Sequence, residues 1–141
     1  MLGPGDAHVL GKVAKEVFDY PVNATFTVEF LNDPRHHLVV ALDEGRVVGF
    51  VSAVHYVHPD KAPELWINEV SVASTHRRRG LAKKLLASMF ALGRSYGCSE
   101  AWVGTERSNS AAMALYASVG GAEPQPDPVY FTFSLSDRVT E

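Results

Sequence analysis

The chain has 141 residues, of which 46% are apolar and 21% charged, a composition typical of one soluble globular domain over residues 1–141. The net charge of −3 argues against a nucleic-acid partner, because nucleic-acid binding relies on broad neutralisation of phosphates. A single cysteine, Cys98, excludes an internal disulfide and a cysteine-rich zinc site, and it favours a reducing, cytoplasmic location. No apolar run approaches the roughly 20 residues that span a bilayer, so neither a membrane segment nor a signal peptide is expected.

The first third of the chain predicts two helices. A helix is expected over residues 6–20, with Asp6 as its candidate N-cap, because apolar residues recur there at helical spacing: Val9, Val13 and Val17. A shorter helix is expected over residues 24–33, where Pro34 ends it.

The middle of the chain predicts three strands and a long helix. Residues 37–57 hold two β-rich runs that flank Asp43-Glu44-Gly45, and this arrangement indicates a hairpin. Residues 64–73 supply a third strand. A helix over residues 81–97, ended by Gly97, carries an apolar stripe: Leu81, Ala82, Leu85, Leu86, Met89 and Phe90.

The last third predicts a short strand over residues 100–105, a helix over 108–121 and a final strand over 130–136. The order of elements is then α, α, β-β-β-α-β-α-β. Such an order is typical of a mixed α/β sheet.

A basic turn, HRRRGLA over residues 76–82, lies between the third strand and the long helix. A helix N-terminus exposes unpaired N–H groups and carries partial positive charge, so it can bind an anion. Gly80 would let the backbone approach the ligand, and the arginines would hold peripheral phosphates. The alternative is a surface turn whose cations are only solvated.

Two stretches of the sequence resemble the GNAT superfamily of N-acetyltransferases. HRRRGLA is similar to its Arg/Gln-x-x-Gly-x-Gly/Ala motif through Arg77, Gly80 and Ala82. NSAAMALYASVGG is similar to its Asn-x-x-Ala-x-x-Leu-Tyr-x-x-x-Gly segment through these residues: Asn109, Ala112, Leu115, Tyr116 and Gly120. The resemblance covers roughly residues 36–135. It departs at Gly121, where an aromatic or aliphatic residue usually follows the glycine.

The resemblance implies a mostly antiparallel sheet with helices on both faces, and acetyl-CoA as the cosubstrate. The strand over 69–72 would splay from the strand over 100–105, and the pantetheine arm would lie in the opening. The pyrophosphate would rest on N–H groups from Arg77 to Ala82. The cofactor contacts so implied are Val70, Ser71, Val72, Arg77, Arg78, Arg79, Gly80, Leu81, Ala82, Lys83, Asn109, Ala112 and Tyr116.

Acetyl transfer needs a base that deprotonates the amine and an acid that protonates the leaving thiolate. Glu69 is the candidate base, because strand alternation predicts that it interrupts one apolar face of the third strand: Leu65, Ile67, Glu69 and Ser71. Tyr116 is the candidate acid. Each has a structural alternative, an ion-paired carboxylate for Glu69 and a packed helix tyrosine for Tyr116. Asn109 is equally well explained as a helix N-cap.

The acceptor is expected to be a small-molecule amine. ELWINEVSVASTHRRRGLAKKLL, with the closing YFTFSLS, is similar to the aminoglycoside 3-N-acetyltransferases of the GNAT type, in which an acidic residue precedes the cofactor turn as Glu69 does here. The predicted substrate contacts are Glu64, Glu69 and Asp127, with Glu64 either a reserve base or a solvated strand end. A polyamine, a small amine metabolite or a protein N-terminus is an alternative acceptor, and a non-catalytic acyl-CoA-binding module is the alternative class.

Those relatives have an opening strand before LGPGD, which this sequence lacks, so an unpaired sheet edge and a homodimer are expected. The sequence contains no cluster of histidines and cysteines at metal-ligand spacing, and no metal is expected.

Overall fold

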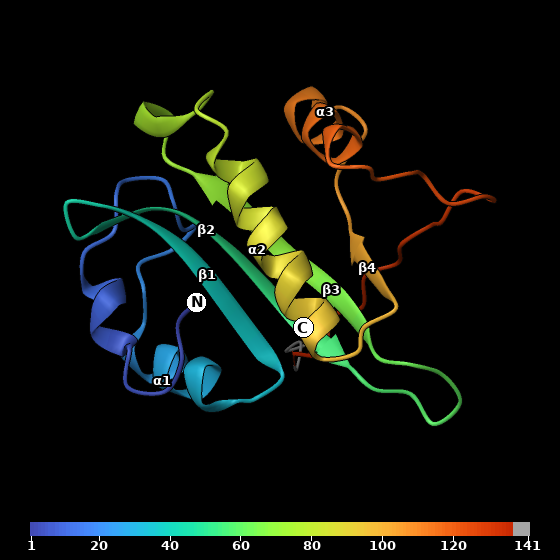
Figure 1. Cartoon of the computed structure of the whole chain (residues 1–141), viewed down its shortest axis with the longest axis horizontal. Coiled ribbons are helices and arrows are strands. Elements are labelled where there is room, and N and C mark those ends of the chain that lie inside the picture. Colours follow the sequence, from blue (N-terminus) through green and yellow to red (C-terminus); the bar gives the residue numbers. More distant parts are fainter. Residues whose placement is uncertain (137–141) are drawn as a thin grey trace, which may run out of the picture.

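A four-stranded sheet organises the chain in the computed structural model, which describes residues 1–136 (Figure 1). The strands lie in chain order: β1 (His36–Asp43), β2 (Arg46–Tyr56), β3 (Glu64–Val72) and β4 (Glu100–Val103). The first three are antiparallel, and β4 is parallel to β3. The predicted mixed, mostly antiparallel sheet is confirmed.

The β1–β2 hairpin closes at the predicted turn. Asp43 pairs with Arg46, and the two residues between them have positive φ values, 50° for Glu44 and 78° for Gly45. Two successive left-handed residues match the right-handed twist of the flanking strands, which explains why an acidic residue followed by glycine stands here.

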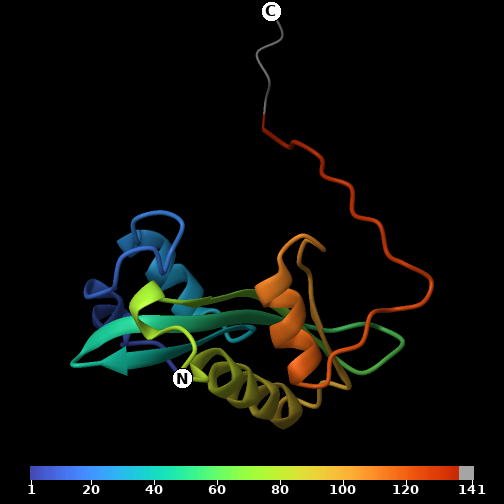
Figure 2. The same cartoon turned by 90° about the horizontal axis from the view of Figure 1, so that it is seen from above.

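Helices cover both faces of the sheet, as predicted. Figure 2 shows α2 (Leu81–Ser95) on one face, and α1 (Ala24–Asn32) and the short 3-10 helix η1 (Ala7–Gly11) on the other. Asn23 caps α1 by accepting a hydrogen bond from the Phe26 N–H at 2.9 Å. The last helix, α3 (Ser110–Ser118), follows β4. The predicted helices over 24–33, 81–97 and 108–121 are therefore present, each with slightly shorter bounds.

Each face of the sheet has its own apolar core. On the α2 face, strand residues pack against three buried residues of the helix: Leu85, Leu86 and Met89. On the other face, β1 and β2 pack against the N-terminal segment and α1 through four buried residues: Leu10, Ala14, Val17 and Leu31. None of the helices within residues 1–136 is both long and apolar enough to cross a membrane.

The helix predicted over residues 6–20 is wrong beyond Gly11. Lys12 is extended, with φ −128° and ψ 102°, and the backbone then pairs with β2. The Val47 N–H donates to the Lys12 carbonyl at 2.8 Å, and the Ala14 N–H donates to the Val47 carbonyl at 2.9 Å. These bonds replace helical ones, and the segment still buries Ala14 and Val17. Asp6 makes no side-chain cap; its carboxylate accepts from the Gly3 N–H instead.

The prediction of a strand over residues 130–136 is also wrong. No residue from 104 to 136 pairs in the sheet, and Figure 2 shows the segment after α3 leaving the body of the molecule. Five large apolar side chains along it are 68–95% exposed: Val129, Tyr130, Phe131, Phe133 and Leu135. The sequence alternates as a strand does, but a strand forms only where another strand pairs with it.

Candidate active site

The parallel strands β3 and β4 pair at one end only. They are in register from the Glu64–Glu100 pair to the Ile67–Val103 pair. Beyond Ile67, β3 continues to Val72 and remains paired with β2 on its other side. The side of β3 toward β4 is therefore open over residues 68–72, which confirms the predicted splay.

A β-bulge lies at the start of this opening. Ser52 of β2 pairs with Glu69, whereas the next residue, Ala53, pairs with Ile67. Asn68 is the extra residue on β3. A one-residue offset reverses which side chains face each side of the sheet from that point on.

The bulge corrects the predicted orientation of Glu69. Leu65 and Ile67 pack against α2, and after the bulge Val70 packs in the same cluster. Glu69 therefore points to the opposite face, toward the N-terminal segment. The prediction that alternate residues of β3 share one face of the sheet is therefore wrong for the set Leu65, Ile67, Glu69 and Ser71.

Glu69 is a partly buried carboxyl with a shifted pKa. Burial raises the pKa of Glu69, and the nearby Asp19 carboxylate raises it further. Asp19 is one of nine residues between Leu10 and Val22 that line a hollow of about 530 Å³ in the N-terminal segment. A raised pKa makes the Glu69 carboxylate a stronger base than an exposed glutamate.

The basic turn leads directly into α2. Gly80 is the N-cap, with φ 75°, and a Cβ added there would meet no atom within 4 Å. The Lys84 N–H donates to the Gly80 carbonyl, so the three preceding N–H groups, from Leu81 to Lys83, have no intrahelical acceptor. The turn thus offers free donors and open space, as an anion site requires.

The three arginines of the turn differ in what they do. Arg77 donates from Nε to the Val72 carbonyl at 3.2 Å, which ties the turn to the end of β3. Arg78 has a left-handed backbone, with φ 63°. All three arginine side chains are exposed, so the remaining guanidinium N–H groups face solvent or a ligand.

Asn109 is the N-cap of α3. Its Oδ1 accepts a hydrogen bond from the Ala112 N–H at 3.1 Å. Of its two predicted uses, the structure therefore contains the helix cap, which occupies the side-chain oxygen and leaves the amide N–H groups available.

Tyr116 is half-buried and packs with Leu115 against the core on the α2 side. Burial raises the pKa of its phenol, which keeps the hydroxyl protonated and able to donate.

The structure shows why residue 121 is a glycine. A Cβ at residue 121 would lie 2.8 Å from the Tyr116 carbonyl oxygen, to which the Gly121 N–H donates at 2.9 Å. The larger residue usual in the GNAT superfamily does not fit this conformation.

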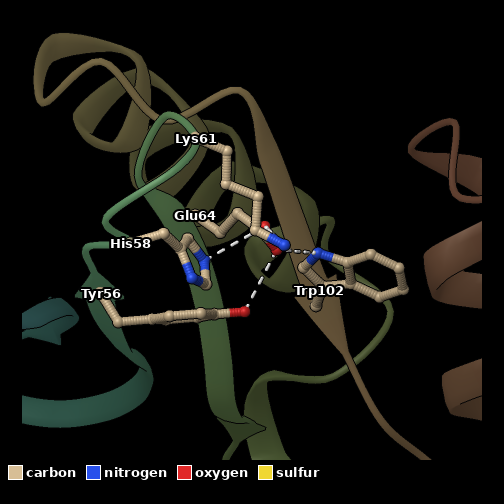
Figure 3. Close-up of polar contacts among 5 residues, drawn as sticks. All are labelled: Tyr56, His58, Lys61, Glu64 and Trp102. Atoms are coloured by element: carbon tan, nitrogen blue, oxygen red, sulfur yellow. Dashed lines mark hydrogen bonds and ion pairs between the residues drawn. The ribbon is translucent and has the colours of Figure 1, made fainter.

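Glu64 is neither solvated nor free. Its Oε2 accepts from Trp102 Nε1 at 2.8 Å and from the Tyr56 hydroxyl at 3.2 Å (Figure 3). Its Oε1 lies 3.3 Å from His58 Nε2 and 3.6 Å from Lys61 Nζ, although the histidine approach lacks hydrogen-bond geometry. Burial alone would raise the pKa of Glu64, but these partners hold it below its usual value.

The third predicted acceptor contact, Asp127, is exposed on the segment that follows α3. Its charge acts on Arg107, which forms an ion pair of 2.6 Å with Glu123. The predicted acids are thus in three different settings: Glu69 beside the opening, Glu64 in a hydrogen-bonded cluster, and Asp127 on the exposed segment.

Sequence reasoning missed the partners that define these settings. No motif in the sequence points to Trp102 or Tyr56, yet both donate hydrogen bonds to Glu64. Asp19 lies in no recognisable motif, and no local pattern joins it to Glu69. Within residues 1–136, no group of three histidine, cysteine or acidic side chains could hold a metal ion.

Comparison with known proteins identifies the family. The model of the acetyltransferase (GNAT) family matches residues 10–120. Human N-acetyltransferase 8 is 35% identical over 95 residues, which are 67% of this chain and 42% of that protein. The L-2,4-diaminobutyric acid acetyltransferase of Nocardia farcinica (strain IFM 10152) is 26% identical over 130 residues, which are 89% of this chain and 66% of that protein. The chain thus spans less than two thirds of the length of these curated relatives.

A similar solved structure is that of the aminoglycoside N-acetyltransferase AAC(6′)-Iy in complex with CoA. Its TM-score is 0.75 at 22% identity, and the match covers 96% of this chain and 92% of that one. At this identity the likeness shows the fold.

The chain belongs to the acetyltransferase (GNAT) family. Acetyltransferases of this family use acetyl-CoA, so the predicted cosubstrate is confirmed. The resemblance to aminoglycoside acetyltransferases is also confirmed at the level of fold, but the similar enzyme AAC(6′)-Iy is named for the 6′ position rather than for the 3-N position.

Proposed function

We propose that this domain transfers the acetyl group of acetyl-CoA to a primary amine of an aminoglycoside. The observation that carries the proposal is the setting of Glu69, a partly buried carboxyl with a raised pKa that lies beside the β3–β4 opening and near a second carboxylate, Asp19. A base next to an anion-binding turn is the arrangement that amine acetylation needs.

The donor site is proposed from two features of the chain. The free N–H groups at the start of α2 and the open space at Gly80 fit a pyrophosphate. The unpaired backbone of β3 fits the amides of a pantetheine arm. The proposed contacts are those named from the resemblance: Val70–Val72 on β3, Arg77–Lys83 at the turn and α2, and Asn109, Ala112 and Tyr116 on α3. Bound acetyl-CoA supplies the thioester carbonyl that the amine attacks.

The proposed chemistry assigns one proton to each of two side chains. Glu69 takes a proton from the acceptor ammonium, directly or through one water, and so generates the neutral amine. Tyr116 donates its phenolic proton to the departing sulfur, and the second proton, which the attacking nitrogen loses as the amide forms, restores the phenol. Its half-buried position on α3 supports this role, because burial keeps the phenol protonated until the thiolate forms.

The acceptor proposal rests on charge. Asp19, whose charge acts on Glu69, is one of the residues that line the hollow in the N-terminal segment, and paired carboxylates favour a polycationic ligand. We keep Glu64 and Asp127 as proposed acceptor contacts, although Glu64 already has four partners. The 3-N amine is the proposed position from the sequence resemblance, and the 6′ amine is the competing one.

A small diamine is the second candidate acceptor, because one relative is named for L-2,4-diaminobutyric acid. The test of both is thiol release from acetyl-CoA across gentamicin, kanamycin, apramycin, spermidine, diaminobutyric acid and a short peptide. Turnover confined to the aminoglycosides supports the proposal, and NMR of the product locates the acetyl group. Turnover on diaminobutyric acid alone would replace the aminoglycoside by a small diamine as the acceptor. CoA binding without turnover on any amine favours the non-catalytic binding module.

We also propose that the protein is a cytoplasmic homodimer. The exposed apolar segment 129–135 and the edge of β4 that faces away from β3 support the dimer, since both lack a partner within residues 1–136. Sedimentation of the protein and of Phe131→Asp/Phe133→Asp tests this. A dimer that becomes monomeric in the double variant is expected, and a monomer at all concentrations contradicts the proposal.

A further inference from the structure

A short chain of polar contacts joins the β1–β2 hairpin to the segment just before the basic turn. Asp43 ends β1, and His76 ends the short 3-10 helix η2 (Ser74–His76). Asp43 Oδ2 lies 2.7 Å from His76 Nε2, and Thr75 Oγ1 lies 2.7 Å from His76 Nδ1. The His76 side chain is only 15% exposed, so the imidazole is largely removed from solvent.

The chemistry of the three groups fixes how they are bonded. An ionised carboxylate can only accept, so Nε2 of His76 carries a proton and donates it to Asp43. In the neutral ring Nδ1 is then the acceptor, and the Thr75 hydroxyl donates to it. The ring is thus held in one tautomer and one orientation.

The contacts stand beside a part of the backbone that needs support. Arg77 directly follows His76, and Arg78 adopts a left-handed conformation that is unfavourable for a residue with a Cβ. One anchor of this turn is the bond from Arg77 Nε to the Val72 carbonyl. The other is the bond from His76 to the hairpin, which comes from a different part of the sheet.

We propose that Asp43 and His76 are positioning residues for acetyl-CoA: from outside the site, they hold residues 77–80 so that the N–H groups at the start of α2 face the pyrophosphate. This inference rests on the proposed donor site at the turn. It assigns a function in binding to a hairpin residue that touches no substrate.

The test compares two ligands that differ in the pyrophosphate. The dissociation constants of CoA and of acetyl-pantetheine, which lacks the nucleotide and its phosphates, are measured by calorimetry or by competition. The variants are Asp43→Ala, His76→Phe, the double variant and Asp43→Asn, whose amide oxygen still accepts from Nε2. Glu44→Gln is the matched control, because it removes a neighbouring carboxylate of the same hairpin. Imidazole ¹⁵N shifts report the tautomer of His76.

We expect Asp43→Ala and His76→Phe each to raise the Kd of CoA about tenfold, the size of one lost charge-assisted hydrogen bond. The Kd of acetyl-pantetheine stays unchanged, the double variant is no worse than either single one, and Asp43→Asn recovers most of the affinity. Glu44→Gln binds as the unmodified protein does. The ¹⁵N shifts show the Nε2–H tautomer, which Asp43→Ala releases.

If the variants raise the Kd of CoA and the Kd of acetyl-pantetheine by the same factor, the two residues have a merely structural role and the inference is overturned. An unchanged Kd of CoA, or additive losses of affinity in the double variant, would also overturn it. If Asp43→Ala does not fold, as judged by circular dichroism, His76→Phe carries the comparison, and Asp43→Asn is still expected to keep most of the affinity. An unmodified protein that binds acetyl-pantetheine as well as CoA overturns the donor site itself, which separates that failure from a failure of the positioning role alone.

Discussion

Trp102 Nε1 donates a 2.8 Å hydrogen bond to Glu64 Oε2, and this bond joins β4 to β3 at the end where the two parallel strands are paired. Four residues on each strand are in register there, from Glu64 to Ile67 and from Glu100 to Val103, and beyond them the strands diverge. The bond therefore helps to hold the paired ends together just before the opening, which begins at Asn68 beside Glu69. A parallel pairing so short depends on side-chain contacts of this kind.

Trp102→Phe should lower the melting temperature by a few degrees, because it keeps the ring but leaves the Glu64 carboxylate short of one donor. Since the strands are then less firmly joined, the KM for acetyl-CoA should also rise. Thermal unfolding and steady-state kinetics measure the two effects. Trp66→Phe is the matched control, since Trp66 pairs opposite Trp102 in the register but makes no side-chain hydrogen bond among the described residues. Equal effects of the two substitutions would contradict the role of the hydrogen bond.

Glu69→Gln should lower kcat by about 10²- to 10⁴-fold at neutral pH, the usual contribution of a general base, with partial recovery at high pH where the free amine is present. Asp19→Asn provides a sharper test. The Asp19 charge raises the pKa of Glu69, so its removal should move the acidic limb of the kcat/KM profile to lower pH. Glu29→Gln, on α1, is the control and should leave the limb in place. A fully active Glu69→Gln protein at pH 7 would remove the base assignment.

Tyr116→Phe should lower kcat at saturating substrates by roughly 10²-fold while the KM for acetyl-CoA changes little, because the variant keeps the packing and loses only the proton donor. The loss should be smaller with an acetyl thioester whose thiol is more acidic, since such a leaving group needs less protonation. Stopped-flow measurement of thiol release separates chemistry from product release. An unchanged kcat across the pH range would assign Tyr116 to packing alone.

The protein should lose stability in mild acid through a buried histidine pair. His37 Nε2 and His55 Nδ1 are 2.7 Å apart, and the Tyr96 ring is stacked on His55 and tilted against His37. Burial, and then the neighbouring His55, lowers the pKa of His37 from 6.5 to about 4. The folded state therefore keeps His37 neutral while the unfolded state takes up a proton below pH 6.5, so stability is full above that pH and falls as the pH drops toward 4.

The expected loss over this range is at most about 3 kcal/mol for His37, from the size of the pKa shift. Urea unfolding at pH 7.5, 6, 5 and 4 measures it. His37→Phe should flatten the dependence, whereas His36→Phe, at the neighbouring and more exposed position, should leave it steep. The same slope in both variants would place the acid sensitivity elsewhere.

Gly121→Ala should destabilise the C-terminal end of α3. The added Cβ would lie 2.8 Å from the Tyr116 carbonyl oxygen, and backbone atoms cannot move aside cheaply. Because the displaced carbonyl belongs to Tyr116, kcat should fall together with stability. Gly120→Ala is a useful comparison, since that glycine has a φ of 92° but open space around it, so its cost is conformational only.

Local signals in the sequence were enough for most of the fold. The hairpin turn at Glu44-Gly45, the start of α2 at Gly80 and the end of α1 before Pro34 each depend on the conformational preferences of neighbouring residues. The family motifs added the splay between β3 and β4 and the cosubstrate.

The failures all came from interactions between distant residues. Residues 12–14 lie where apolar residues recur at helical spacing, but they pair with Val47 of β2. No local pattern in the sequence predicts this pairing. The bulge at Asn68 depends on how β3 aligns with β2, so alternation alone put Glu69 on the wrong face. The four partners of Glu64 converge from β2, β4 and the loop before β3, and no spacing along the chain links them.

The opening along β3 also separates two tasks within a single strand. Over residues 69–72, the open backbone edge of β3 is the part proposed to face the donor, whereas the Glu69 side chain is the part proposed to face the acceptor. Backbone recognition tolerates almost any residue that keeps the strand extended. A chain built in this way can therefore change its acceptor by exchanging side chains on one face while its use of acetyl-CoA is inherited unchanged.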